Sequence, residues 1–334
     1  MGAYKMHNRK RLFTKMKTII LVSIVTVSTI LYAMAYRYLI ERVEARVSDN
    51  NTTTIVNTNS TTTNNNTSNG TSSTNNSSTT KESSEVKYDD WSYNSNGIEI
   101  SIKKNTKGSG SDKITYYVAD VKLKDSSYLH SAFAKNEYGR NILETTSDIA
   151  NNNGAIFAIN GDYYGFRSDG VLIRNGKLYR DEPTRTSAAL CSNGNMESFD
   201  EKEVSSEELL KNGVIDTFSF GPVLIKDRNI VDNSGKVVID TNFGNRSIED
   251  PNPRTGIGMI EANHFVFIVV DGRSEDSRGM TLSEFAETFK ELGCTEAYNL
   301  DGGGSSTMYF MGRVVNNPLG ENKERKISDI LYIK

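Results

Sequence analysis

Apolar and polar residues alternate along several short stretches in the middle of the chain, which is the pattern of strands with one buried face. The stretches "GIEISIKK" (97–104) and "ITYYVADVKLK" (114–124) follow this period of two. A continuous apolar stretch, "GAIFAI" (154–159), predicts a strand that is buried on both faces. In "VLIRNGKLYR", two strand-like stretches flank Asn175 and Gly176, the dipeptide favoured in type I′ turns, so a β-hairpin is predicted there.

One segment near the C-terminus has the period of an amphipathic helix. Thr281, followed three residues later by Glu284, forms a capping-box pattern, and Gly293 stands where a helix would end. Apolar side chains recur between them at helical spacing: Leu282, Phe285, Phe289 and Leu292. Ser205 and Glu208 form the same capping pattern before a shorter predicted helix.

The predicted helix after Thr281 lies between two predicted strands, one ending at Asp271 and one ending near Leu300. Strand, helix and strand over residues 265–300 form a βαβ unit, which makes its two strands parallel and places their carboxyl ends at one edge of the sheet. We therefore expect Asp271, Gly272 and Arg273 to lie near the turn that follows the second strand. The fold class is α+β or mixed α/β, with a mixed β-sheet core and a few helices.

The N-terminal part of the chain has a different composition. Residues 1–17 contain six Lys and Arg residues and no acid, and residues 18–36 form an uncharged run of 19 residues. This length is close to the ~20 residues of a transmembrane helix, and the preceding cations orient the N-terminus to the cytoplasm. We therefore expect a single-pass membrane anchor with the remainder outside the cell. A cleaved signal peptide is the alternative, because "AMA" (33–35) fits a cleavage site.

Residues 37–84 are dominated by Asn, Thr and Ser and predict a disordered linker, because such a tract has too little apolar surface to offset the entropy of ordering. Residues 85–334 are then the folding unit, large enough for one core. The formal net charge of −3 becomes −9 once the six cations of residues 1–17 are set aside, which argues against a nucleic-acid partner. Two cysteines, Cys191 and Cys294, allow one disulfide or two buried thiols.

The stretch "NLDGGGSST" (299–307) combines a carboxylate, three glycines and three hydroxyl groups. No Gly-x-x-x-x-Gly-Lys-Ser/Thr motif is present, so a nucleotide P-loop is excluded. Histidine is too rare, at three residues, for a histidine-rich zinc site. What remains is carboxylate chemistry beside an anion, because the backbone amides of a glycine-rich turn bind anions and arginine binds phosphate in a bidentate manner.

Five motifs together resemble the phosphodiester glycosidase family. They are "AINGDYY" (158–164), "FGPVLIKD" (220–227), "PRTGIG" (253–258), "VVDGRSEDSRGMTLSEFAE" (269–287) and "NLDGGGSSTM" (299–308), in that order. The resemblance covers about residues 151–334. It implies hydrolysis of the bond between a sugar anomeric carbon and a phosphodiester oxygen of a glycan, which leaves a free sugar and a phosphomonoester.

The resemblance also gives candidate site residues, whose individual roles stay open. The catalytic carboxylates would be Asp301 and Asp271, with Asp162 as a third candidate. The phosphate would be held by Arg254, Arg273, Gly302, Gly303, Gly304, Ser305 and Ser306. The sugar would be oriented by Asn160 and Asn299, with Arg185 facing the same cleft.

Two other functions remain open on the sequence. The same cleft could hold phosphodiester-linked glycans without turnover, as in a polysaccharide-binding protein. No cofactor is required by the sequence, but the three aspartates could ligate a hard cation such as Ca²⁺ or Mg²⁺, as in a metal-dependent phosphodiesterase that cuts the P–O bond.

Overall fold

The computed structural model describes residues 2–47, 54–55, 86–232 and 250–334. Its two largest sheets are antiparallel and pack face to face. The nine-stranded sheet has the order β16-β15-β19-β17-β18-β6-β5-β4-β3 and the five-stranded sheet has the order β21-β20-β9-β22-β7. The strands of the first are β3 (Lys87–Tyr88), β4 (Ser92–Asn94), β5 (Ile98–Lys107), β6 (Ile114–Leu123), β15 (Val223–Lys226), β16 (Asn229–Ile230), β17 (Arg254–Glu261), β18 (His264–Val270) and β19 (Glu296–Asn299).

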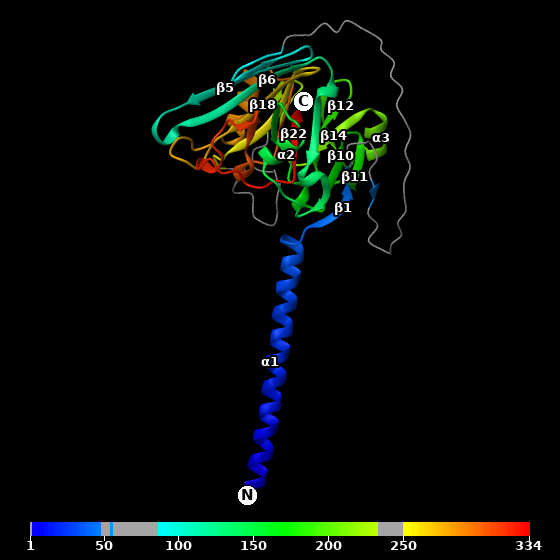
Figure 1. Cartoon of the computed structure of the whole chain (residues 1–334), viewed down its shortest axis with the longest axis vertical. Coiled ribbons are helices and arrows are strands. Elements are labelled where there is room, and N and C mark those ends of the chain that lie inside the picture. The colour runs from blue at the N-terminus through cyan, green and yellow to red at the C-terminus, as the bar shows by residue number, and fades with distance from the viewer. Residues whose placement is uncertain (1, 48–53, 56–85, 233–249) are drawn as a thin grey trace, which may run out of the picture.

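The strands of the five-stranded sheet are β7 (Leu129–Phe133), β9 (Phe157–Asn160), β20 (Met308–Phe310), β21 (Arg313–Val314) and β22 (Asp329–Ile333). Side chains of both sheets meet in one core, where the rings of Phe157 and Phe267 lie 5.1 Å apart. Helix α5 (Leu282–Glu291) covers the outer face of the larger sheet, and helix α2 (Thr146–Asn152) covers the outer face of the smaller one. Figure 1 shows these layers beside a smaller group of strands.

Strand β18 shows why this part of the chain is apolar at every position. Phe265, Phe267 and Val269 face the core between the sheets, whereas Val266 and Ile268 face α5. Successive side chains of a strand point to opposite faces, so a strand covered on both sides needs apolar residues throughout.

The smaller group consists of a hairpin, a three-stranded sheet and one helix. Strands β10 (Gly170–Arg174) and β11 (Lys177–Glu182) form the predicted hairpin, and Asn175 and Gly176 both have positive φ, as a type I′ turn requires. The sheet β13-β12-β14 contains β12 (Thr186–Cys191), β13 (Met196–Asp200) and β14 (Val214–Phe218), and α3 (Ser206–Lys211) follows Ser205 as expected. Cys191 and Cys294 are both buried and unpaired.

The predicted βαβ unit is present with one strand inserted. Strands β18 and β19 both pair antiparallel with β17, which lies between them, so they run in the same direction and end at the same edge. Helix α5 makes the connection. The expected approach of the segment after β18 to the segment after β19 is therefore confirmed, although the sheet pairings themselves are all antiparallel.

The N-terminal segment differs partly from expectation. Helix α1 (Gly2–Tyr38) includes a stretch, Lys15–Tyr38, that is long and apolar enough to cross a membrane, and none of that stretch is buried in the protein. A signal sequence has the same properties. The predicted linker, 37–84, is wrong at its beginning, because β1 (Arg42–Arg46) pairs with β8 (Glu137–Arg140) and with the short β2 (Thr54–Ile55). The polar tract that follows lies outside the described residues apart from 54–55.

Strand β1 could not be recognised from local composition. Its residues are mostly charged, and its stability comes from backbone pairing with β8 and from Ala45, which is buried against Phe133 and Tyr138. A strand of this kind depends on partners that lie about ninety positions further along the chain.

Replacing Thr281 by alanine should lower the free energy of unfolding by ~0.5–2 kcal/mol. The Thr281 hydroxyl accepts a hydrogen bond from the amide of Glu284, and the Glu284 carboxylate accepts one from the amide of Thr281. The substitution removes the hydroxyl and leaves the Glu284 amide, one helix-terminal donor, without its partner. Urea unfolding of the full chain measures the effect. Thr281→Ser keeps the hydroxyl and should remain near the parent, and equal losses in both variants would contradict the capping role.

Candidate functional site

The candidate site lies where β9, β18 and β19 end and β17 begins. Asn160 is the last residue of β9, and its side chain joins three segments that meet there. Its amide nitrogen donates to the carbonyl of Asp301 at 2.7 Å, and its oxygen accepts the hydroxyl of Thr255 at 2.8 Å and the amide of Thr307 at 3.2 Å. Asn160 is fully buried, and these contacts use both ends of its amide. It therefore fixes Asp301 in place, whereas we had expected it to orient a sugar directly.

The carboxylate of Asp301 faces two donors. Ser305 Oγ donates to Oδ2 at 2.5 Å, and Arg325 Nη2 lies 3.2 Å from the same oxygen. Arg325 also donates to Ser305, and its side chain is 46% exposed, so it reaches Asp301 from the solvent side. Burial raises the pKa of Asp301, while the charge of Arg325, the hydrogen bond from Ser305 and the charge of Arg167 oppose the rise.

An aromatic cluster surrounds Arg167 beside this carboxylate. The rings of Tyr163 and Phe166 are stacked with their centroids 4.5 Å apart, and the guanidinium of Arg167 lies 5.4 Å from the Tyr163 ring and 4.9 Å from the Phe220 ring. Burial and Arg185 lower the pKa of Arg167, whereas Asp162, Asp169 and Asp301 raise it. The cluster of Tyr163, Phe166, Arg167 and Phe220 is thus in electrostatic reach of Asp301, and half-buried aromatic faces of this kind bind sugar rings and cations.

The glycine turn after Asp301 is held against the start of β17. The amide of Gly303 donates to the carbonyl of Pro253 at 2.9 Å, and Gly303 has a φ of +60°. A Cβ at position 302 would lie 2.8 Å from the same carbonyl, so only glycine permits this approach. Within the described residues, the amides of Gly302 and Gly304 donate to no protein acceptor. Two of the three glycine amides are therefore available for a ligand.

Arg273 lies beside the same turn. It has a φ of +59°, donates to the side-chain oxygen of Asn252 at 2.9 Å, and its guanidinium is 3.3 Å from where a Cβ on Gly303 would be. Arg254 is more deeply placed: its Nε donates to the carbonyl of Met280 and its Nη2 to that of Asp250. Burial, and next Arg273, lower the pKa of Arg254 to about 10. Arg254 thus supports the two loops, while Arg273 borders the glycine turn.

Asp271 is hydrogen-bonded to the segment that contains Asn316 and Asn317. Its Oδ1 accepts Asn316 Nδ2 and the amide of Asn317, both at 3.0 Å, and Asn316 also donates to the carbonyl of Ser306. Burial raises the pKa of Asp271, and these hydrogen bonds oppose the rise. The segments that carry Asp271 and Asp301 therefore converge, but the two carboxylates have separate sets of hydrogen-bond partners.

Two residues expected to bind the substrate, Asn299 and Ser306, have buried polar atoms without a partner within the described residues. Asn299 donates to the carbonyl of Gly221 at 2.8 Å, but its Oδ1 is buried and, within the described residues, has no partner. The hydroxyl of Ser306 is buried without a partner in the same part of the structure. Such atoms cost free energy unless a water or a ligand pairs with them. Ser305, by contrast, is engaged with Asp301 and Arg325.

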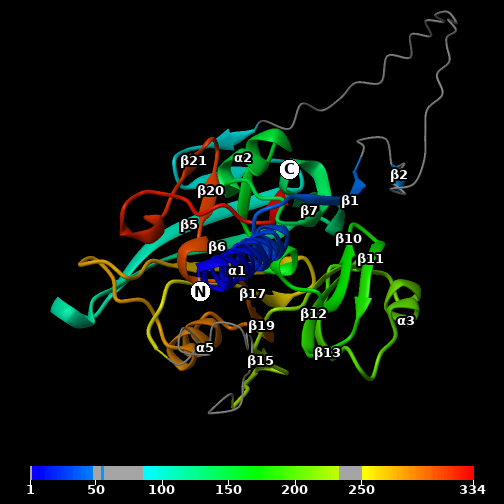
Figure 2. The same cartoon turned by 90° about the horizontal axis from the view of Figure 1, so that it is seen from below.

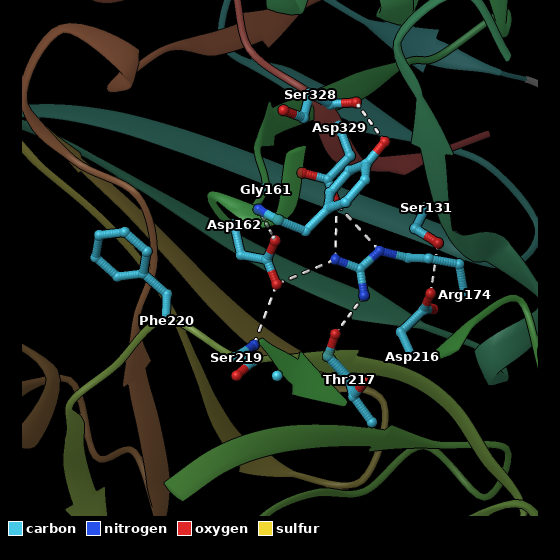
Figure 3. A network of polar contacts seen from close by, with 12 residues as sticks. Ser131, Gly161, Asp162, Arg174, Asp216, Thr217, Ser219, Phe220, Ser328 and Asp329 are labelled. Atoms are coloured by element: carbon cyan, nitrogen blue, oxygen red, sulfur yellow. Dashed lines mark hydrogen bonds and ion pairs between the residues drawn. The ribbon is translucent and has the colours of Figure 1, made fainter. Parts of the chain in front are cut away.

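Asp162 occupies a different position from the one expected of a catalytic carboxylate. Its Oδ1 accepts the amide of Tyr164 and its Oδ2 accepts the amide of Ser219, while Arg174 Nη2 lies 3.3 Å from Oδ2 (Figure 3). Both the carboxylate and the guanidinium are buried. Asp162 therefore holds the loop of Tyr163 and the residue before Phe220, and it supports the aromatic cluster from behind.

The buried Arg174 is shared by several acids. It donates to Asp329 at 2.7 Å and to the carbonyl of Thr217, and Asp216 lies on its other side beside Ser131 (Figure 3). Burial alone would lower the pKa of Arg174, but Asp329, Asp162 and Asp216 raise it. Burial raises the pKa of Asp329 to about 7 and that of Asp216 to about 6, because one arginine cannot compensate three desolvated carboxylates.

Arg185 lies at the rim of the same region. It donates to the carbonyl of Ser219 at 3.1 Å, as Arg167 also does, and it pairs with Asp169 at 2.9 Å. Arg185 is expected to face the same cleft as Asp301. The support for this expectation is that Arg185 and Arg167 donate to the same carbonyl, that of Ser219. Its own ion pair and hydrogen bonds connect it to the loops that surround the aromatic cluster.

The sequence did not reveal several of the closest neighbours of Asp301. Arg325 lies in the charged stretch "ENKERK", which is typical of an exposed loop, and Arg167 lies three residues beyond the motif "AINGDYY" (158–164). Arg174 and Asp329 lie in strands, and nothing in their local pattern separates them from surface charges. Within the described residues, no three His, Cys, Asp or Glu side chains come together in a way that could hold a metal ion.

Comparisons with known proteins agree with this geometry. Residues 153–334 match the model of a family described as phosphodiester glycosidase. The chain is 30% identical over 243 residues to the SPbeta prophage-derived uncharacterized protein YomE of Bacillus subtilis (strain 168), covering 66% of this chain and 36% of that protein. It is 35% identical over 79 residues to N-acetylglucosamine-1-phosphodiester alpha-N-acetylglucosaminidase of Bos taurus, covering 24% of this chain and 15% of that enzyme. The chain thus spans about a third or less of the length of these relatives.

Two solved structures share the fold. The catalytic domain of the zebrafish enzyme of the same name, auto-inhibited by its pro-peptide, matches with a TM-score of 0.57 and 23% identity, over 72% of this chain and 84% of that one. A hypothetical protein from Synechocystis matches with a TM-score of 0.54 and 13% identity, over 76% of this chain and 64% of that one.

Asp216→Asn should flatten the pH dependence of stability between pH ~4 and about 6. The folded-state pKa is raised, so in this window the folded protein holds a proton that the unfolded chain has lost, and stability falls as the pH rises by up to ~1.4 kcal/mol per pH unit. Asparagine mimics the neutral form at every pH. Urea unfolding at several pH values measures the slope; the exposed control Asp90→Asn should keep the parent slope, and parallel curves for parent and Asp216→Asn would refute the assignment.

Proposed function

Because the chain belongs to the phosphodiester glycosidase family, we propose that it hydrolyses the bond between the anomeric carbon of a sugar and a phosphodiester oxygen. One water is consumed: its oxygen becomes the anomeric hydroxyl, the bond from the anomeric carbon to oxygen breaks, and the bonding electrons leave with the phosphate. The products are a free sugar, a phosphomonoester and one proton released to solvent. N-acetylglucosamine is the first sugar to test, because it stands in the name of the bovine relative.

The observation that supports this proposal is the environment of Asp301. A buried carboxylate lies between Arg325 and Arg167, beside a turn with two unoccupied glycine amides. An oxocarbenium-like transition state is stabilised by a carboxylate near the anomeric carbon, and the departing phosphate is stabilised by cations and amide donors. We propose that the glycine turn and the two arginines together meet both requirements. We propose that Asp301 acts in its ionised form, because the charges of Arg325 and Arg167 oppose the rise in its pKa that burial causes.

The remaining groups divide between the two parts of the substrate. The amides of Gly302 and Gly304, the hydroxyl of Ser306 and the guanidinium of Arg273 would hold the phosphate, since they lie in or beside the glycine turn. The aromatic cluster and Asn299 Oδ1 would contact the sugar. Asp162, Asp271, Asn160 and Arg254 are positioning residues in this account, because their described contacts are with neighbouring loops.

We also propose that α1 anchors the protein in a membrane with residues 42–334 outside. The support is the apolar stretch Lys15–Tyr38, whose side chains the domain leaves exposed, and the cluster of cations before it. The substrate would then be a glycan outside the cell.

Asp301→Asn should reduce sugar release by roughly 10²- to 10⁴-fold, because it removes the negative charge and keeps the shape. The assay offers the purified full chain N-acetylglucosamine 1-(methyl phosphate) and measures free sugar and methyl phosphate. Asp148→Asn, on the exposed first turn of α2, is the matched control and should keep full activity.

The products decide between this function and the two alternatives. Binding of the substrate without turnover by the parent chain would favour a glycan-binding protein. A sugar phosphate as product, lost on addition of a chelator, would favour a metal-dependent phosphodiesterase. Full activity of Asp301→Asn would remove Asp301 from the mechanism.

Arg325→Gln should move the acidic limb of the pH profile of kcat/KM to higher pH. Arg325 favours the ionised carboxylate, so its loss raises the pKa of Asp301, and a group that must be ionised then becomes active only at higher pH. Arg313→Gln, a change to a cation outside this site, is the comparison. A shift of the alkaline limb instead would show that Asp301 acts as the protonated acid.

A further inference from the structure

The end of helix α1 is attached directly to the folded domain. Asn141 Nδ2 donates to the carbonyl of Arg37 at 3.1 Å and to that of Ile40 at 2.9 Å, which satisfies acceptors at the C-terminus of α1. After Tyr38, the last residue of α1, β1 begins at Arg42. So short a connection spans only ~10 Å even when extended. Figure 2, which views the molecule from the side where α1 leaves, shows α1 and β1 together on that side.

The length of the apolar run in α1 predicts the depth in the membrane at which Asn141 contacts the helix. The uncharged run 18–36 has 19 residues, which at ~1.5 Å per residue matches a hydrocarbon thickness of ~30 Å. The next residue, Arg37, therefore lies at the level of the lipid headgroups. Tyr36 and Tyr38 are placed as in the aromatic belts of membrane proteins, with the guanidinium of Arg42 4.7 Å from the Tyr36 ring. Asn141, in contact with Arg37, lies at the same level.

From Asn141 the candidate site is one hydrogen bond away. The amide of Asn141 donates to the carbonyl of Gly165 at 3.3 Å. Gly165 lies between Tyr164 and Phe166 in the short helix η4 (Tyr164–Phe166), which carries the aromatic cluster. Arg167 follows at once, and its charge lowers the pKa of Asp301. Hydrogen bonds and the chain itself therefore connect the end of α1 to the aromatic cluster, whose Arg167 is in electrostatic reach of Asp301.

Three arginines, Arg42, Arg140 and Arg180, lie along the same series of contacts from the end of α1 to the aromatic cluster. Arg42 and Arg140 are directly opposite each other on β1 and β8, an arrangement of like charges that is unfavourable by itself. Burial, and next Arg42 and Arg180, lower the pKa of Arg140. Arg180 in turn donates to the carbonyls of Tyr164 and Arg167. A phosphate at headgroup level would relieve this repulsion, and arginine is the preferred residue for binding it.

We propose that the sugar phosphodiester cleaved at this site is carried by a membrane lipid, with its phosphate ester on a lipid alcohol. This inference rests on the proposed function. The hydrogen bonds of Asn141 hold the domain against the end of α1, so the anchor proposed above would keep the site near the headgroups, where the phosphate of such a lipid lies. Hydrolysis as written above then leaves the lipid monophosphate in the membrane and releases the sugar to water.

The test uses the full chain in lipid vesicles with two substrates. One is N-acetylglucosamine joined through phosphate to a polyprenol in the same vesicles, and the other is N-acetylglucosamine 1-(methyl phosphate) in solution. A variant receives a Gly/Ser segment of about 20 residues between Ile40 and Glu41, which adds a separation of roughly 25 Å. Its turnover of the lipid substrate should fall about tenfold or more, since the effective concentration at the site is lost, while turnover of the soluble substrate stays at the parent level.

The outcomes separate this inference from the function on which it rests. Equal effects of the insertion on both substrates, or turnover of the soluble substrate alone, would overturn the lipid assignment and leave the hydrolase intact. Turnover of neither substrate by the parent chain would overturn both. Arg140→Gln should raise KM for the lipid substrate only, with Arg46→Gln, on the same strand pair and bonded to Glu137, as its control. An intact mass showing a membrane-extracted chain without residues 1–35 would also overturn the proposal.

Discussion

The side chain of Asn160 is the interaction on which the arrangement of the site depends. Strand β9 belongs to the five-stranded sheet, whereas Thr255 and the segment before Asp301 belong to the nine-stranded sheet. One buried amide joins them by three hydrogen bonds, and a buried polar group of this kind is stable only when all its partners are present. The relative position of the two sheets therefore fixes Asp301, and the carboxylate sits where both sheets end.

Two kinds of charge compensation are found side by side. Asp301 faces Arg325 from a solvent-accessible direction, so its ionisation can follow its surroundings. Asp162, by contrast, shares the buried Arg174 with Asp329 and Asp216, and burial raises the pKa of both Asp329 and Asp216. The buried cluster around Arg174 gives the loops a fixed geometry. The carboxylate of Asp301, which Arg325 reaches from the solvent side, can change its interactions when a substrate binds.

The sequence predicted those elements whose pattern is local. The strand alternation, the turn at Asn175 and the capping box of Thr281 each depend on neighbours within a few positions, and all three are present. The convergence of the segments after β18 and β19 followed from topology alone. Arg325 and Arg174 could not be found in this way, because their roles come from partners far along the chain. The family resemblance made Asp162 a third candidate for a catalytic carboxylate, and its two amide donors and its arginine become visible only in three dimensions.

The pairing of strand β1 with the folded domain changes the role expected for the polar tract between residues 47 and 86. Both neighbours of that tract, β1 before it and β3 after it, belong to the folded domain, so the tract is not what joins α1 to the domain. Within one chain, the short pairing of β1 with β8 benefits from a high effective concentration. A single proteolytic cut in the tract would remove that advantage, and the residues before the cut would be held to the rest of the domain by the five-residue strand β1 and by the hydrogen bonds of Asn141 to the end of α1. With α1 as the proposed anchor, release of the domain would then depend on the opening of these few contacts.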